Sequence, residues 1–184
     1  MKNLKEFPVI IGKNITLREI NENDKEDFFG IFGSDEILKY YGMKAYKTEE
    51  DSFGLMKRMI NLFNTKRGIR WAITQTKSKK LIGTIGYKYW DTRSKKGEIS
   101  YEIQKEFWNK GIATEAISCV VKFGFKNGLN RIEAWDMEEN AASKKVLQKN
   151  SFVHEGTLRQ HIYWNGKFHN IEWFSILKNE YQEK

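Results

Sequence analysis

One stretch of the chain has residue types and a spacing suited to binding a diphosphate. A predicted strand runs through the loop 105-KEFWNKG-111 directly into a helix predicted over residues 112–125. Gly111 allows a tight backbone turn, Ala113 keeps the first helical turn small, and Lys110 adds a cation. Unpaired N–H groups at a helix N-terminus, together with the helix dipole, attract phosphates. An ordinary loop-to-helix connection shares this pattern, so the segment alone does not decide the chemistry.

A second informative segment is 140-NAASKKVLQKNSF-152. Asn140 and Ser143 lie at the start of a predicted helix that comes immediately before another strand. Asn140 is a good N-cap residue, and this simple structural role explains its presence equally well. The two segments together, at this spacing and in this order of elements, are much more specific than either one alone.

The sequence lacks the motifs of several enzyme classes. The sequence contains no GxxxxGK[ST], GxGxxG or GxSxG motif, which argues against kinases, dehydrogenases and serine hydrolases. His154, His161 and His169 do not have the spacing of a metal motif, and a single cysteine, Cys119, cannot build a thiolate site. We expect Cys119 to be a buried, inert thiol and the protein to bind no metal.

Length and composition limit the class of protein. The chain has 184 residues, and we expect residues 1–184 to form one domain. The net charge of +8 favours anionic ligands without choosing among nucleic acid, membrane surface and polyphosphate. One cysteine fits a reducing compartment, and residues 1–10 lack the apolar core of a signal peptide. No apolar stretch approaches the ~20 residues of a membrane span. We expect a cytoplasmic protein without membrane attachment.

The spacing of apolar residues predicts the elements that position these segments. Strands are expected over 14–20, 69–76, 81–90, 97–104 and 131–136, and as a hairpin over 152–177 that turns at 165-NG-166. Helices are expected after a cap at Asn23 or Asp24, over 48–64 with Thr48 as N-cap and Leu55, Met59, Leu62 and Phe63 on one face, over 112–125, and over 140–150. This order predicts an α/β (α+β) fold, a mixed, mainly antiparallel twisted sheet of six to seven strands flanked by about four helices.

With these motifs the sequence resembles the GNAT N-acetyltransferase family, in particular the bacterial ribosomal-protein N-terminal acetyltransferases. The segment 108-WNKGIA-113 matches the family's acetyl-CoA loop, [QR]-x-x-G-x-[GA], except that Trp108 replaces Gln or Arg. Further motifs of this branch match 114-TEA-116, the spacing of Asn140 and Ser143, 155-EGTLR-159 and 165-NG-166. The similarity runs from 14-NITLRE-19 to 172-EWFSILKNE-180 and implies the GNAT fold.

The resemblance implies acetyl-CoA as co-substrate and names the residues that bind it. The pantetheine arm is expected along the backbone of Tyr101, Glu102 and Ile103. The residues expected to wrap the pyrophosphate are Asn109, Lys110, Gly111, Ile112, Ala113 and Thr114. Asn140 is expected to hydrogen-bond the pantetheine and Ser143 to lie near the sulfur. Lys144, Lys145 or Lys149 is expected to meet the 3′-phosphate, and a solvated helix face is the simpler explanation for three lysines on one helix.

Three positions depart from the family pattern. Leu147 stands where many relatives carry a tyrosine that protonates the leaving thiolate, so Ser143 is the nearest candidate for that role. Ser151 replaces a glycine before the next strand, which affects local backbone detail. Asn170 replaces an aspartate that often follows the histidine of the last hairpin, which weakens any inference about substrate recognition there.

The general base is expected to be Glu98, acting directly or through water. Glu98 lies on the strand before the loop, close to where some relatives place a catalytic glutamate, and shares a face with Ser100 and Glu102. An exposed strand glutamate is an equally good explanation. Asp91 is a second candidate, for which a turn at the end of a strand is the simpler explanation.

These residues predict an acetyltransferase in which a neutral amine attacks the thioester directly. The acceptor is expected to be a protein N-terminal α-amine, and the alternative is a small-molecule amine such as a polyamine or an antibiotic. A CoA-binding relative without catalysis is a further alternative. So is an RNA-binding module that uses 77-KSKK-80 and 93-RSKK-96, but these predicted turns lack interleaved aromatic residues, so no specific nucleic-acid partner is expected. The oligomeric state is left open, a homodimer included.

Overall fold

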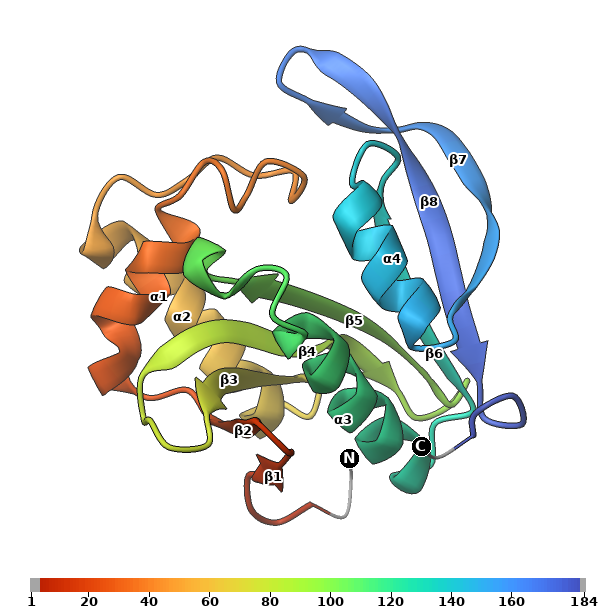
Figure 1. Ribbon diagram of the computed structural model, residues 1–184, viewed down its shortest axis with the longest axis horizontal. Helices are drawn as coiled ribbons and strands as arrows, with labels where there is room; N and C mark the ends of the chain where they lie inside the picture. Colours follow the sequence, from red (N-terminus) through yellow and green to blue (C-terminus); the bar gives the residue numbers. More distant parts are fainter. Residues whose placement is uncertain (1–3, 183–184) are drawn as a thin grey trace.

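The backbone is organised around an eight-stranded sheet with the strand order β1-β2-β3-β4-β5-β6-β8-β7 (Figure 1). The structure is a computed structural model, and it describes residues 4–182. The strands are β1 (Ile10–Ile11), β2 (Ile15–Glu19), β3 (Ile69–Gln75), β4 (Leu81–Asp91), β5 (Lys96–Ile103), β6 (Arg131–Met137), β7 (Val153–Trp164) and β8 (Lys167–Leu177). The predicted strands are confirmed. The eighth strand, β1, has two residues, too few for an alternating pattern to reveal it.

Four α-helices and two short 3-10 turns complete the described chain. The helices are α1 (Lys25–Phe32), α2 (Glu49–Asn64), α3 (Ile112–Lys126) and α4 (Ala141–Lys149), and the turns are η1 (Glu22–Asp24) and η2 (Lys105–Phe107). Thr48 caps α2 by accepting a hydrogen bond from the Asp51 N–H at 3.1 Å, and Asn140 caps α4, as predicted. None of the described helices is long and apolar enough to cross a lipid bilayer.

The sheet opens between β5 and β6. Every other neighbouring pair of strands is antiparallel, whereas β5 and β6 run parallel. Their register joins Lys96–Glu98 to Arg131–Glu133 and stops there. The facing edges of Ile99–Ile103 and Ala134–Met137 therefore lack a ladder partner, and the strands part toward the N-terminal ends of α3 and α4.

Two apolar clusters cover the two faces of the sheet. On one face α3 packs against the strands, and the Tyr87 hydroxyl donates to the Val120 carbonyl oxygen at 2.9 Å. On the other face α1 and α2 pack together around Phe28, Phe32 and Met56. Residues that alternate along a strand therefore point toward different helices: Trp71 toward the α3 cluster and its neighbour Ala72 toward the α1–α2 cluster.

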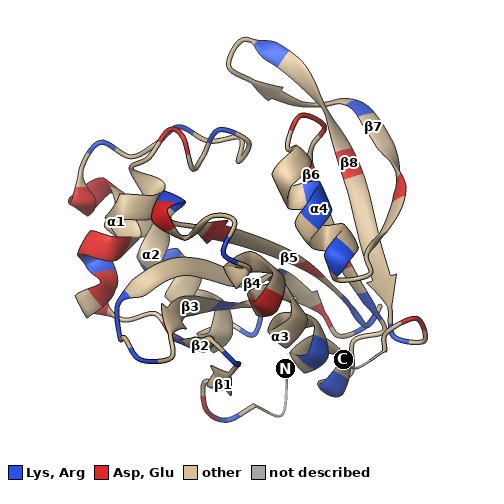
Figure 2. Cartoon of the chain, in the orientation of Figure 1, with Lys and Arg blue, Asp and Glu red and all other residues tan. Residues whose placement is uncertain are grey.

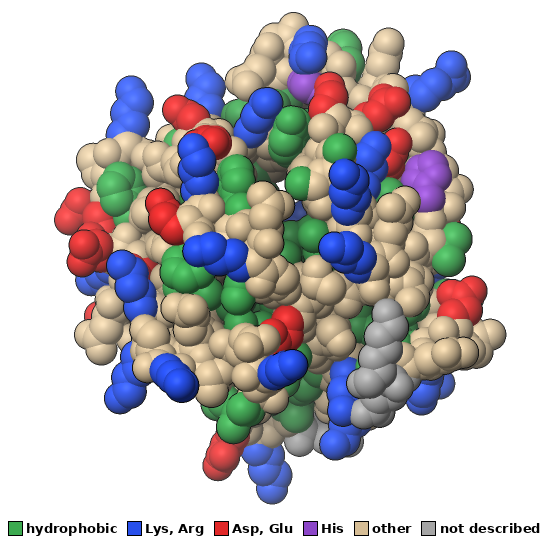
Figure 3. All heavy atoms as spheres, in the orientation of Figure 1, with side chains coloured by type: hydrophobic (Ala, Val, Ile, Leu, Met, Phe, Trp, Pro, Cys, Tyr) green, Lys and Arg blue, Asp and Glu red, His purple; other side chains and the backbone are tan. Residues whose placement is uncertain are grey.

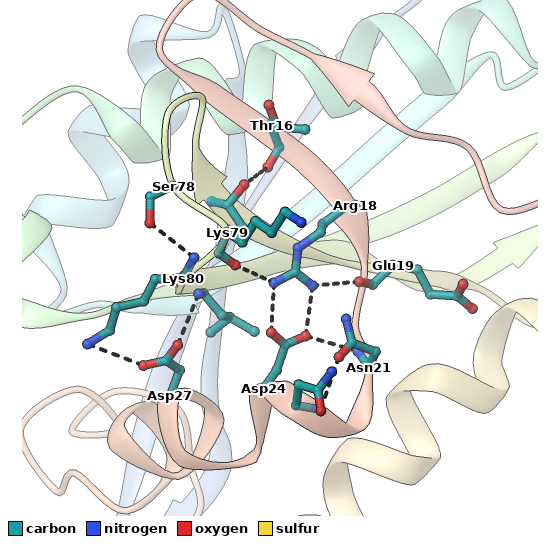
Figure 4. A network of polar contacts seen from close by, with 12 residues as sticks. Thr16, Arg18, Glu19, Asn21, Asp24, Asp27, Ser78, Lys79 and Lys80 are labelled. Carbon is teal, nitrogen blue, oxygen red and sulfur yellow. Dashed lines mark hydrogen bonds and ion pairs between the residues drawn. The ribbon is translucent and has the colours of Figure 1, made fainter.

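The start of α1 agrees with the prediction in position only. Asp24, one of the two residues expected as cap, takes the N-cap position of α1, but its side chain makes no capping hydrogen bond. Asn21 caps the 3-10 turn that precedes α1. The Asp24 carboxylate returns to the Asn21 N–H at 2.9 Å and pairs at both oxygens with Arg18 of β2, at 2.7 and 2.8 Å (Figure 4). Asp24 is thus occupied in joining η1 to the sheet.

The buried face of α2 also differs in part from the predicted face. Met59 and Phe63 are buried as predicted, whereas Leu55 and Leu62 are half-buried and Ser52 and Met56 take the inner positions. The predicted face is turned because α2 packs both on β3 and on α1, so Met56 faces the α1 cluster and Leu55 lies at its margin.

Candidate active site

The opening between β5 and β6 forms one side of a cavity of about 730 Å³. Its walls come from β5, the loop that leads into α3, β6, α4 and the segment 36–41. Figure 3 shows this face of the molecule hollowed near its centre, with lysine and arginine side chains around the hollow. The cavity joins the two segments that the sequence singled out, since Gly111, Ala113, Asn140 and Ser143 all line it.

The loop before α3 presents unused backbone donors to the cavity. Gly111 is the N-cap of α3 with φ +79°, a left-handed conformation that glycine adopts without strain, and it has no side chain to cover the first N–H groups. The acidic residue of the first turn, Glu115, is turned away and accepts from Asn14 at 2.8 and 2.9 Å. The N-terminus of α3 is therefore an open anion site beside the cavity.

Trp108 anchors this loop. Its indole N–H donates to the Ile103 carbonyl oxygen at 2.8 Å, so Trp108 supplies a donor where Gln or Arg is usual. The predicted pyrophosphate residues Asn109, Gly111, Ile112, Ala113 and Thr114 all line the cavity. Lys110, the remaining member of that set, is not part of the lining, and its ammonium lies 5.5 Å from the centre of the Phe107 ring.

The β5 edge fits the role expected for a pantetheine arm. Tyr101, Glu102 and Ile103 line the cavity, and they belong to the part of β5 that has no ladder partner on the β6 side. An extended amide chain can bind such an edge as an added strand, because unpaired backbone groups template it. The residues present therefore suit acetyl-CoA.

Ser143 takes part in a network that joins α4 to both separated strands. Its hydroxyl lies 2.6 Å from the Tyr101 hydroxyl of β5. Its N–H donates to the Asn140 side chain at 3.3 Å, and the Asn140 amide donates to Asp136 of β6 at 2.8 Å. An amide NH₂ carries two N–H donors, and Asp136 takes one of them.

Asp136 is a residue of the cavity wall that no sequence pattern indicated. This residue is nearly buried, lines the cavity and accepts from the Met137 N–H at 2.9 Å. Burial raises the pKa of Asp136 to about 6, although hydrogen bonds from Ser143 and Asn140 work against the increase. Burial also raises the pKa of the Tyr101 hydroxyl, which therefore remains protonated.

Glu98 contacts residues of the cavity wall from behind. It is not part of the lining, and its Oε1 accepts from the Trp135 indole N–H at 3.0 Å and lies 3.3 Å from the Lys88 ammonium. Trp135 and Lys88 do line the cavity, so the carboxylate is separated from it by these two side chains. Asp91, the second candidate, accepts from the N–H groups of a turn, at Arg93 and Ser94, as its simpler explanation predicted.

The lysines of α4 divide between two roles. Figure 2 shows these basic residues along α4. Lys144 donates to the Glu138 carbonyl oxygen at 2.9 Å and pairs with Glu172 at 3.0 Å, which ties α4 to β8. Lys145 and Lys149 line the cavity. These two are therefore better placed than Lys144 to meet a phosphate.

The other departures from the family pattern have structural explanations. Leu147 is buried in the α3 cluster, and Ser151 holds a left-handed φ of +64°, the conformation that a glycine would hold there. Asn170 accepts from the Gln160 N–H and donates to Glu138, each at 2.8 Å, so its amide joins β7, β8 and the loop before α4. An aspartate could not donate the second of these bonds.

The comparisons agree with this geometry. Residues 14–153 match the model of the acetyltransferase (GNAT) domain. The uncharacterized N-acetyltransferase YoaA of Bacillus subtilis (strain 168) is 39% identical over 173 residues, which is 94% of this chain and 98% of that protein.

Two solved structures share the fold. RimL, a ribosomal L7/L12 alpha-N-protein acetyltransferase in complex with coenzyme A, has a TM-score of 0.85 at 18% identity, covering 92% of this chain and 98% of that chain. Spermidine N-acetyltransferase from Vibrio cholerae, in complex with CoA and spermine, has a TM-score of 0.80 at 20% identity, covering 91% and 97%. These likenesses establish the fold and leave the acceptor open.

Proposed function

The chain belongs to the GNAT family and is an acetyl-CoA-dependent N-acetyltransferase, and we propose that its acceptor is the α-amine of a protein N-terminus. The proposal places the reaction in the cytoplasm. It rests mainly on the charge of the cavity wall, and the fold shared with RimL, whose name gives a protein α-amine as acceptor, adds to it.

The charged lining of the cavity is not suited to a polycation. Its basic members are Lys39, Lys88, Lys145 and Lys149, and its acidic members are Glu36, Glu102 and Asp136. Two of the acids are already paired, Glu36 with Lys105 and Glu102 with Arg70. Lys88 is paired as well, with Glu98, and Lys145 and Lys149 lie on α4, the side proposed for the CoA phosphate, which leaves Lys39 and Lys88 on the acceptor side. A polyamine with several ammonium groups would meet these two lysines, whereas a peptide brings one amine and neutral amides.

The free-energy cost of deprotonating the acceptor also favours an α-amine. Deprotonating an amine of pKa ~10.4 at pH 7 costs about 4–5 kcal/mol, whereas an α-amine of pKa ~7.8 costs about 1 kcal/mol. Glu98 is separated from the cavity by Trp135 and Lys88, so proton transfer to it needs a water relay. An acceptor that loses its proton easily suits such an indirect base.

The proposed reaction is a single direct transfer. Acetyl-CoA supplies the thioester carbonyl carbon; the amine nitrogen forms a C–N bond to it and the C–S bond breaks. Glu98 receives the proton from nitrogen through water and then releases it to solvent. Ser143, hydrogen-bonded to Tyr101, gives a proton to the leaving thiolate and regains one from solvent. Backbone N–H groups on the open edge of β5 polarise the carbonyl, and most of the rate comes from this positioning.

Acetylation of an amine panel tests the acceptor. The panel holds a peptide with a free α-amine and a blocked lysine, the same peptide with a blocked α-amine and a free lysine, spermidine and an aminoglycoside. The products are identified by mass spectrometry. We expect the first peptide to have the highest kcat/KM. Preferred acetylation of spermidine or the aminoglycoside would contradict the proposal and support the small-molecule alternative.

A further inference from the structure

A second hollow of about 660 Å³ lies beside the cavity, and we call it the outer hollow. Its walls come from the end of α1, from the loop over 35–47 and from residues 164–165 at the tip of the β7–β8 hairpin. A Cβ placed on Gly42 would lie 3.8 Å from Met137 Cε and 3.9 Å from Ile162 Cγ2, so this loop reaches β6 and β7. The outer hollow is therefore formed by segments that are far apart in sequence.

The less exposed part of this lining is mainly apolar. Leu38 is buried, and Phe29, Met43, Tyr46 and Trp164 are half-buried. Apolar and aromatic walls of this kind bind the backbone and the methylene groups of a ligand. They give the outer hollow a surface on which an extended peptide can lie.

The exposed part of the lining is basic. Its members are three lysines, Lys39, Lys44 and Lys47, together with Asp35 and Asn165. Within the described part of the chain, none of the three lysines forms an ion pair with an acidic side chain. Figure 2 shows basic residues along the loop that joins α1 to α2. A positive edge beside apolar walls suits a ligand that carries carboxylates.

Lys39 connects the two spaces. It lines both the cavity and the outer hollow, and its ammonium lies 5.0 Å from the centre of the Tyr40 ring. Tyr40 and Tyr41 line the cavity, whereas Met43 lines the outer hollow alone. An acceptor chain whose α-amine lies at the acetyl group can therefore leave the cavity beside Lys39 and continue into the outer hollow.

We propose that the outer hollow binds the residues that follow the N-terminal residue of the acceptor protein, and that these residues are acidic. The inference rests on the proposed transfer to a protein α-amine and adds the class of sequence that the enzyme selects. Glutamate and aspartate side chains bring carboxylates to Lys39, Lys44 and Lys47, while the peptide backbone lies on the apolar walls. Attraction between opposite charges favours such a sequence during encounter and in the complex.

An acidic peptide fits this place better than RNA does. RNA phosphates are also attracted by lysines, but three lysines offer few of the contacts on which RNA affinity depends. A peptide is held in addition by its α-amine in the cavity, and this anchor raises the effective concentration of the following residues in the outer hollow. The same weak contacts therefore suffice for a peptide and are insufficient for RNA.

Peptides that differ only after their second residue test the proposal. They share their length and first two residues, so the pKa of the α-amine is the same, and the following positions carry glutamate, glutamine or lysine. We expect kcat/KM to be about 10- to 100-fold higher for the glutamate peptide than for the lysine peptide, mainly through KM. Added salt should reduce this ratio, because it screens exposed charges.

The result separates this inference from the proposed function. Equal kcat/KM for the three peptides would overturn the inference and leave the α-amine acceptor in place. Acetylation of spermidine and of none of the peptides would contradict the proposed function, and the inference with it.

The double variant Lys44→Glu/Lys47→Glu reverses two charges that line the outer hollow and not the cavity. We expect a higher KM for the glutamate peptide and loss of its advantage over the lysine peptide, with an unchanged thermal shift on adding acetyl-CoA. The matched control, Lys77→Glu/Lys79→Glu, makes the same change of net charge in the exposed loop between β3 and β4, which lines neither space, and should keep the preference.

Two outcomes of this comparison would overturn the proposal. Equal loss of the preference in both double variants would assign it to the net charge of the protein. Inhibition by a random RNA that is lost only in Lys44→Glu/Lys47→Glu, without any preference among the peptides, would assign the outer hollow to nucleic acid.

Discussion

The hydroxyl of Tyr101 lies 2.6 Å from the hydroxyl of Ser143, which joins β5 to α4 across the open part of the sheet. Leu147, one turn after Ser143 on α4, is buried in the core and has no hydroxyl to offer. A tyrosine hydroxyl is nevertheless present at this end of the cavity, brought by β5. Its contact with Ser143 fixes the orientation of the serine hydroxyl.

Loss of the Ser143 hydroxyl should slow the chemical step. We expect Ser143→Ala to lower kcat about 100-fold, since it removes the proposed proton donor, and Tyr101→Phe to lower it about 10-fold. Steady-state kinetics at saturating acetyl-CoA measure both effects, with the acetyl-CoA thermal shift as a check on binding. A kcat within about twofold of wild type in Ser143→Ala would remove the serine from the mechanism.

Glu98→Gln should give an activity that depends on pH differently from wild type. We expect a lower kcat at neutral pH and partial recovery at high pH, where the amine loses its proton without help. The matched control is Glu133→Gln. Glu133 lies opposite Glu98 on the neighbouring strand β6, but its carboxylate hydrogen-bonds Tyr89 and Arg131. Activity equal to wild type across the whole pH range would show that Glu98 takes no part.

Much of this arrangement could be predicted from local patterns. The 165–166 turn, the Asn140 cap and the loop before α3 depend on residues close in sequence, and the structure has them where expected. The diphosphate loop is the clearest example, because Gly111, the following helix and the small Ala113 lie within one short segment.

The missed residues depend on contacts that are distant in sequence. Arg70 was not predicted, and it meets Glu102, whose backbone was, only because β3, β4 and β5 pair side by side in the sheet. Asp136 ends a predicted strand, but it faces the cavity because β5 and β6 separate there. Tyr41 lies in a segment without helical or strand periodicity, so no pattern placed it. Asp24 takes the N-cap position of α1 as predicted, but it makes no capping hydrogen bond there because its carboxylate pairs with Arg18 of a neighbouring strand.

Asp136 should make the stability of the protein depend on pH. The folded-state pKa is about 6 and the ordinary value is 3.8, so between these values the folded state binds more protons than the unfolded state. Stability from this group is therefore lost as pH rises through that window. Between pH 4 and pH 7, wild type should lose about 2 kcal/mol in the free energy of unfolding relative to Asp136→Asn, because this range crosses most of the interval between the two pKa values. Urea denaturation of both proteins from pH 4 to pH 7 measures this difference, and a constant difference would contradict the raised pKa.

Alanine variants of two glycines with similar backbone conformations distinguish the effect of backbone strain from the effect on ligand binding. Gly111 has φ +79° and lines the cavity, whereas Gly128, beyond the other end of α3, has φ +93° and does not. Alanine at either position is expected to cost about 1–2 kcal/mol of stability, because a Cβ strains a left-handed backbone. Only Gly111→Ala should also reduce the thermal shift on adding acetyl-CoA. Equal shifts in the two variants would contradict a phosphate site at this loop.

The most direct test of the acetyl-CoA site is a thermal melt of the wild-type protein with and without acetyl-CoA. At a concentration of about 100 times Kd, binding should add roughly 2.7 kcal/mol to the free energy of unfolding. For a chain of this size that corresponds to an increase in Tm of roughly 5–10 °C. An increase of this size, reduced in Gly111→Ala, is the result we predict. An unchanged Tm at saturating acetyl-CoA would contradict the binding of the co-substrate between β5, α3 and α4.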